Sequence, residues 1–200
     1  MTIEGRPTSD VQPAIDGGGS HRVFTVKSEA VLKLTHLIIR NGKVKEAVSG
    51  DDNGYGGGFD ISGNATFIDC IITGHLSESN YYSGGGWGGA FYIRGGNTLF
   101  ENCIITKNSV SGCGGTCPTN GAGAFYIVGG THTFQGCIIS HNTATTNDHV
   151  QAGAFQISDA EITFINSSIV DNTATTGSFR SLGGGICASG SKLTLSLIHI

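Results

Sequence analysis

The chain has 200 residues, of which 13% are charged, and its formal net charge is −4. It contains no basic run, which argues against nucleic acid as a partner, and no apolar stretch of membrane-spanning length. Its 33 glycines accompany only 3 prolines. This balance is typical of tight turns between many short strands, and not of a disordered chain.

One sequence pattern repeats along the chain, in residues 22–42, 56–75, 88–108, 123–142, 153–172 and 183–200. In each repeat an aromatic or aliphatic residue stands two or three positions after the first residue of the repeat. These residues are Phe24, Phe59, Phe91, Phe125, Phe155 and Ile186. They lie 30 to 35 positions apart, so each repeat combines strands of constant length with one loop of variable length.

Each repeat predicts three short strands. The first has apolar residues at every second position, as in Phe91 and Ile93 with Tyr92 between them, which is the period of a strand. The second is centred on Phe67, Phe100, Phe134 or Phe164, and the third holds the apolar pairs 71–72, 104–105, 138–139 and 169–170. Such strands bury their inner faces only when like coils stack. We therefore predict an all-β fold, a parallel β-helix solenoid of about six coils with three short strands each.

Two other repeat architectures fit the residues less well. Helical repeats are built from runs of Ala, Leu, Glu and Lys, whereas these repeats are rich in Gly, Thr, Ile and Phe. A β-propeller blade has four strands and usually more than about forty residues, which is longer than these repeats.

Three consecutive repeats contain GGAFYI, GAGAFYI and QAGAFQI, followed by FENCIITKN, FQGCIISHN and FINSSIVDN. These segments resemble the repeats of pectin-lyase-like right-handed β-helices and, within that class, the GGAI or GGAF repeats of polymorphic outer-membrane proteins and related adhesins. The resemblance implies a right-handed solenoid that lies outside the cell or at its surface. It does not choose between functions, because adhesins, lyases and glycosidases share the fold.

The two ends of the chain look cut. The first ten residues, MTIEGRPTSD, lack the charged start and apolar stretch of a signal peptide. We interpret residues 1–194 as one β-helix repeat region, a fragment of a longer solenoid whose open coil ends self-associate. Residues 195–200, LSLIHI, match the translated end of a sequencing adaptor and are interpreted as a non-native tail. The alternative is the second strand of a sixth coil.

The acidic residues do not form the pattern expected of a catalytic site. The only adjacent acidic pair is Asp51 and Asp52, followed by Asn53. These side chains carry oxygen ligands suited to calcium, although a solvated turn explains them as well. Glycosidases of this fold class use clustered carboxylates with G-H-G and R-I-K segments, and neither segment occurs here. We expect no cofactor apart from calcium at this turn.

Two recurring positions predict structural ladders. Asn108, Asn142 and Asn172 follow the third strand at the same offset, and stacked amides hydrogen-bond along a solenoid. Where the resembled repeats have Asn after the second strand, this chain has Cys70, Cys103 and Cys137. Adjacent coils hold their Cβ atoms near 4.8 Å, wider than the roughly 3.8 Å of a disulfide. We expect three stacked free thiols.

Two further cysteines lie in a glycine-rich loop. Cys113 and Cys117 are close enough in SGCGGTCPTNG to form a disulfide, which would indicate an oxidising compartment. Free thiols, or metal binding and redox chemistry, are the alternatives.

The candidate ligand surface is aromatic. Tyr92 and Tyr126 occupy the same outward position in consecutive coils, and the loop before Tyr92 holds Tyr81, Tyr82 and Trp87. The tyrosines form either a stacked cross-strand pair covered by loops or a platform for sugar rings or for a protein partner.

These observations favour a non-catalytic surface or secreted module that binds a glycan or a protein, or that acts as a spacer. The alternative is a polysaccharide-active enzyme, a lyase or glycoside hydrolase, whose catalytic coils are missing or divergent.

Overall fold

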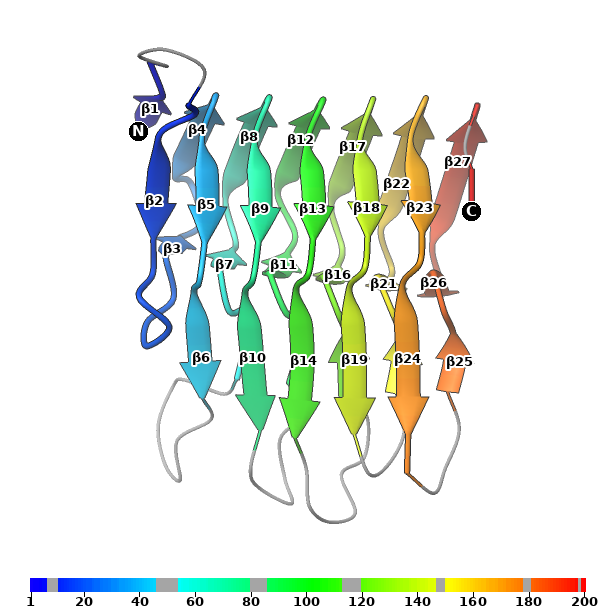
Figure 1. Ribbon diagram of the computed structural model, residues 1–200. Helices are drawn as coiled ribbons and strands as arrows, with labels where there is room; N and C mark the ends of the chain where they lie inside the picture. The colour runs from blue at the N-terminus through cyan, green and yellow to red at the C-terminus, as the bar shows by residue number, and fades with distance from the viewer. Residues whose placement is uncertain are drawn as a thin grey trace.

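The computed structural model describes residues 1–6, 11–45, 54–79, 86–112, 120–146, 150–177, 181–197 and 199–200. In this part of the chain the fold is all-β, and every strand pairs with its neighbours in parallel. The strands wind into a right-handed parallel β-helix of about five turns (Figure 1). No helix in the described ranges is long and apolar enough to cross a membrane.

Three sheets surround the main core. Sheet I contains β3 (Phe24–Val26), β7 (Phe59–Ile61), β11 (Phe91–Arg94), β16 (Phe125–Val128), β21 (Phe155–Ser158) and β26 (Ile186–Ser189). Sheet II contains β1 (Thr2–Glu4), β4 (Val31–Thr35), β8 (Asn64–Ile68), β12 (Asn97–Glu101), β17 (Thr131–Gln135), β22 (Glu161–Ile165) and β27 (Lys192–Ser196). Sheet III contains β2 (Ala14–Asp16), β5 (Ile38–Arg40), β9 (Ile71–Thr73), β13 (Ile104–Thr106), β18 (Ile138–Ser140) and β23 (Ser168–Val170).

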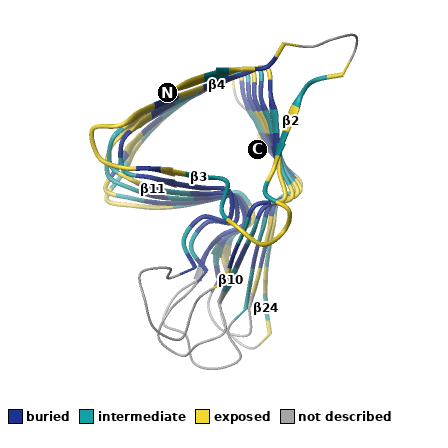
Figure 2. Cartoon of the chain, turned by 90° about the vertical axis from the view of Figure 1, so that its left-hand side faces the viewer, coloured by how far each residue is buried: buried dark blue, intermediate teal, exposed yellow. Residues whose placement is uncertain are grey.

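Two further, smaller sheets extend the coils to one side of this core, as the view along the rod in Figure 2 shows. Sheet IV contains β6 (Lys43–Lys45), β10 (Leu76–Ser79), β14 (Ser109–Gly112), β19 (Thr143–Thr146) and β24 (Thr173–Thr176). Sheet V contains β15 (Asn120–Ala122), β20 (Val150–Ala152) and β25 (Ser181–Gly183). A second, smaller core of Val110, Ala144 and Val150 lies within this extension.

The expectation of three strands per coil was wrong, because in the described residues sheet IV adds a fourth strand to five coils and sheet V adds a further strand at three places. Apart from β6, these strands fall almost entirely in residues 77–87, 109–122, 143–152 and 173–182, which the repeat pattern assigns to the variable loop. In the strand Thr143–Thr146, Thr143 and Thr145 are exposed and the buried residue is the small Ala144, so the apolar alternation is too weak to mark a strand. The variable loop of each repeat begins only after the strand of sheet IV.

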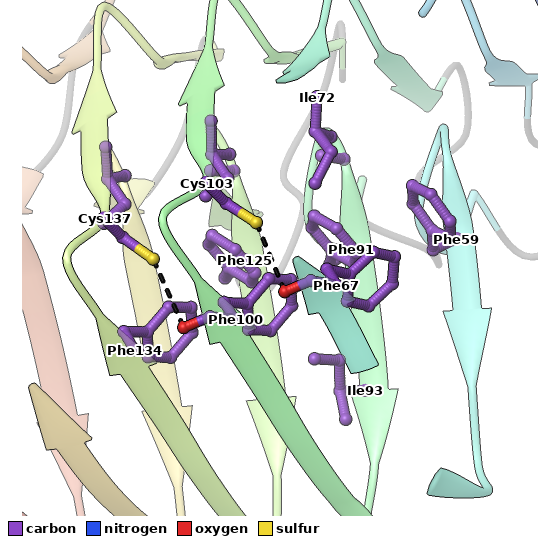
Figure 3. Close-up of a cluster of buried hydrophobic side chains, with 14 of the residues drawn as sticks. Phe59, Phe67, Ile72, Phe91, Ile93, Phe100, Cys103, Phe125, Phe134 and Cys137 are labelled. Carbon is purple, nitrogen blue, oxygen red and sulfur yellow. Dashed lines mark hydrogen bonds between the residues drawn. The ribbon is translucent and has the colours of Figure 1, made fainter. Parts of the chain in front are cut away.

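Phenylalanines fill the main core in two columns (Figure 3). In-register pairing places Phe91 beside Phe125, and rings in this column stack with centroids 4.6–4.7 Å apart from Phe59 to Phe155. The second column, on sheet II, stacks in the same way, with Phe67 4.7 Å from Phe100. Rings of the two columns meet edge to face, the preferred arrangement of aromatic quadrupoles. The predicted inward phenylalanines are confirmed.

Cysteines form a third buried column. Cys70, Cys103 and Cys137 are free thiols, and Cys103 donates to the carbonyl of Phe67 one coil earlier, over 3.4 Å. Ser167 takes this position in a later coil, and its hydroxyl donates to the carbonyl of Phe134 over 3.2 Å. The column therefore supplies one small donor per coil to a buried carbonyl.

Asparagines form a hydrogen-bonded ladder between sheets III and IV. Asn108 donates from Nδ2 to Oδ1 of Asn142 over 3.0 Å, and Asn142 donates in the same way to Asn172 over 2.9 Å. Each amide also donates to a backbone carbonyl of the preceding coil. The ladder satisfies buried polar groups at the turn from the main core into the extension.

Candidate functional site

The outer face of sheet I carries an aromatic cluster, which we define as Tyr55, Trp87, Tyr92 and Tyr126. Tyr92 and Tyr126 point outward from β11 and β16 in register. Tyr55 and Trp87 lie just before β7 and β11 and pair with each other through a single parallel bridge. All four side chains are half-buried.

Glycine turns place Tyr55 and Trp87 over this face. Gly56 and Gly88 follow them, with φ of 53° and 72°, in the left-handed region that favours glycine. A Cβ at either position would also overlap the carbonyl of the next phenylalanine, Phe59 or Phe91. The chain therefore reverses closely enough to bring the preceding aromatic ring against sheet I.

The tyrosine rings stack along the rod. Tyr92 lies 4.3 Å from Tyr55, at an interplanar angle of 11°, and 5.5 Å from Tyr126, at 23°. Because one partner comes from the coil before and the other from the coil after, both faces of the Tyr92 ring are covered. Trp87 meets Tyr126 edge to face at 4.6 Å.

The hydroxyls of Tyr92 and Tyr126 remain protonated at neutral pH. Burial, helped by the neighbouring Tyr55, raises the pKa of Tyr92 to about 12. Burial also raises the pKa of Tyr126. Tyr92 and Tyr126 therefore present neutral hydroxyls that can donate hydrogen bonds.

A buried carboxylate orients a cation beside the rings. Asp60 of β7 is 8% exposed and accepts from Arg94 at 3.1 and 3.2 Å. The Arg94 guanidinium lies 5.1 Å from the Tyr92 ring centre, within the range of a cation–π contact, and its side chain is 48% exposed. Arg22 lies 4.0 Å from Asp60 and donates to the carbonyl of Tyr55 over 2.6 Å.

The outward column of sheet I continues beyond Tyr126 with an amide, Gln156, and a thiol, Cys187. Gln156 follows Tyr126 in the outward column of sheet I and is 8% exposed. Among the buried side-chain oxygen and nitrogen atoms of the described residues, Oε1 of Gln156 is the one without a hydrogen-bond partner. Beyond it, the Cys187 thiol donates to Gln151 over 3.4 Å, and burial raises the pKa of Cys187.

The structure brings together Trp87, Tyr92 and Tyr126 of the predicted ligand-binding residues. Tyr81 and Tyr82 lie outside the described residues. Sequence analysis missed Tyr55 and Arg94 as members of the site. A signal for Tyr55 was present, because it precedes Phe59 by the same four positions that separate Trp87 from Phe91.

The remaining candidate sites cannot be placed in the same way. Asp51, Asp52 and Asn53, and the cysteines Cys113 and Cys117, fall outside the described ranges. Within those ranges no group of three or more His, Cys, Asp or Glu side chains could hold a metal ion.

Comparison of the chain with protein-family models, with curated proteins and with solved structures finds no match.

Proposed function

We propose that this β-helix is a non-catalytic binding module of a surface or secreted protein, and that the aromatic cluster with Arg94 docks a protein partner. One observation carries the proposal: neighbouring tyrosines cover both faces of Tyr92, while the half-exposed Arg94 lies beside the rings. A sugar ring stacks on an exposed aromatic face, which Tyr92 does not offer. Tyr, Trp and Arg are the residues that dominate binding energy between proteins.

The site is ordered before a partner arrives. In-register strands hold Tyr92 and Tyr126, and Asp60 holds Arg94. Side chains that are already fixed lose little conformational entropy on association. The exposed guanidinium favours a partner that brings a carboxylate to the aromatic edges.

The proposed location rests on the repeats themselves. GGAFYI and its relatives resemble those of polymorphic outer-membrane proteins and adhesins of the pectin-lyase-like class, which act at the cell surface. This resemblance supports a surface or secreted protein, and the aromatic cluster supports binding as its role.

Peptides selected from a displayed random library against the folded chain test the proposal. We expect them to carry acidic and aromatic residues. Tyr92→Ala and Trp87→Ala should each weaken binding about tenfold or more, because truncating a central aromatic side chain removes a large share of the binding energy. Isothermal titration calorimetry of the variants measures the loss.

Gln135→Ala is the matched control, because Gln135 is exposed on the outer face of sheet II and its loss should leave the affinity unchanged. Peptides that bind both aromatic variants as tightly as the original chain would contradict the proposal. Saturable binding to a glycan array that both substitutions abolish would assign a glycan ligand instead.

A further inference from the structure

One position of the asparagine ladder holds a histidine. His75 occupies the place of Asn108, Asn142 and Asn172 in the second coil and is fully buried. Its Nδ1 accepts the backbone N–H of Gly42 over 2.9 Å, and its Nε2 lies 3.1 Å from the carbonyl of Ile39. It thus joins residues 22–45, which form the first coil with β3 to β6, to the rest of the solenoid.

These two hydrogen bonds require a neutral ring. Nδ1 must lack a proton to accept from Gly42, and Nε2 must carry one to donate to Ile39. A protonated Nδ1 would face the Gly42 N–H, donor against donor. The ring has no room to turn away, because a Cβ at Gly42 or Gly58 would come within 2.7 or 2.9 Å of it and Phe59 packs edge-on at 6.0 Å.

The charged groups on the surrounding strands do not offset the cost of protonating the buried His75 ring. Asp16 of β2 acts on the ring only through space, and it is paired with Arg40 of β5. Lys43 of β6 pairs with Glu78 of β10, and Asp60 of β7 pairs with Arg94. Burial is the largest effect and lowers the pKa of His75 to about 4.

We propose that His75 makes the contact between the first and second coils an acid-sensitive joint, at which mild acid loosens residues 22–45 while the strands around Asn172 stay closed. The first coil carries Arg22, which donates to the Tyr55 carbonyl, so the loosening reaches the edge of the aromatic cluster. The joint itself does not depend on what that cluster binds.

The direction of the pH effect on the stability of the joint follows from proton linkage. The pKa of His75 in the folded chain, about 4, lies below its unfolded value of 6.5. The closed joint is therefore fully stable above pH 6.5 and loses stability as the pH falls from 6.5 towards 4. Between pH 7 and pH 5 the opening constant should rise about 20-fold.

Hydrogen exchange measured by mass spectrometry at pH 7 and pH 5, corrected for the intrinsic exchange rate, tests this. In the unchanged chain we expect about 20-fold more opening at pH 5 in peptides from residues 31–45, and no comparable rise in peptides from residues 168–177, which pair with strands other than that of His132. His75→Asn restores the residue type of the other coils and should remove the rise.

A second buried histidine provides the internal control. His132 accepts at Nδ1 from Thr98 over 2.9 Å and lies 2.9 Å from the Gly129 carbonyl, and burial lowers its pKa as well. His132→Ile, which introduces the residue of the next coil at that position, should leave the acid response of residues 31–45 intact.

An unchanged rise in His75→Asn, or an equal rise in residues 168–177, would overturn the proposal. If His75→Asn does not fold, NMR titration of the unchanged chain decides. The His75 ring should stay neutral at pH 5.5, and titration near pH 6.5 would refute the joint.

Discussion

Truncation of Phe125 to alanine is expected to lower the free energy of unfolding by about 3–5 kcal/mol. Phe125 is fully buried in the middle of its column. It stacks on Phe91 at 4.7 Å and on Phe155 at 4.6 Å, and it meets Phe100 and Phe134 edge to face. Its removal leaves a cavity between rigid coils that cannot collapse around it, so the loss combines transfer and cavity terms.

Phe24→Ala is the control for this experiment. Phe24 occupies the same column but is only partly buried, and its stacking contact is Phe59 at 5.5 Å. Urea unfolding of the two variants should show a clearly smaller loss for Phe24→Ala. Equal losses, or an unchanged midpoint for Phe125→Ala, would contradict the stacked core.

Substitution of Gly123 by alanine is expected to cost about 3 kcal/mol although it adds a single methyl group. A Cβ at Gly123 would overlap the carbonyl oxygen of Gly153 and lie 2.5 Å from the backbone nitrogen of Thr143. Both obstacles are backbone atoms of neighbouring chain segments, so relief requires movement of a coil. Gly57, Gly89 and Gly153 are confined by backbone atoms in the same way, where one coil turns from the extension back to sheet I.

Gly185→Ala is the matched control, because the nearest atoms to its added Cβ are side-chain methyls at 3.7 Å. We expect a change of about 0.5 kcal/mol or less. The comparison uses thermal unfolding followed by circular dichroism. Similar behaviour of the two variants would show that backbone contact does not explain the glycine at position 123.

The main core could be predicted from the sequence because its information is local and repeated. Phe91 and Ile93 alternate with Tyr92, and the alternation recurs at Phe125 and Ile127. The same residues therefore predict both the strands and the register in which neighbouring coils pair. Sheets IV and V could not be predicted, since their strands bury small residues such as Ala144 and Ala152. A threonine-rich strand and a threonine-rich loop have the same composition.

The candidate site was predicted in part for a similar reason. Register alone places Tyr92 beside Tyr126, so the pair could be read from the repeats. Tyr55 reaches Tyr92 only through the left-handed turn at Gly56, and Arg94 is set by the buried carboxylate of Asp60. Contacts that depend on a turn or on charge pairing across coils do not produce a repeating sequence pattern. The stacking of Tyr55 on the second face of Tyr92 was for this reason not foreseen, whereas the stacking of Tyr92 on Tyr126 was one of the two predicted arrangements.

Acrylamide quenching of tryptophan fluorescence tests the proposed docking surface most directly, because Trp87 is the only tryptophan in the chain. The half-buried indole should be quenched readily in the free protein. A saturating concentration of a selected peptide should lower the quenching constant of Trp87, since the partner would cover the edge of the aromatic cluster. A quenching constant that stays the same at saturation would show that the partner binds elsewhere and would contradict the assignment of this surface.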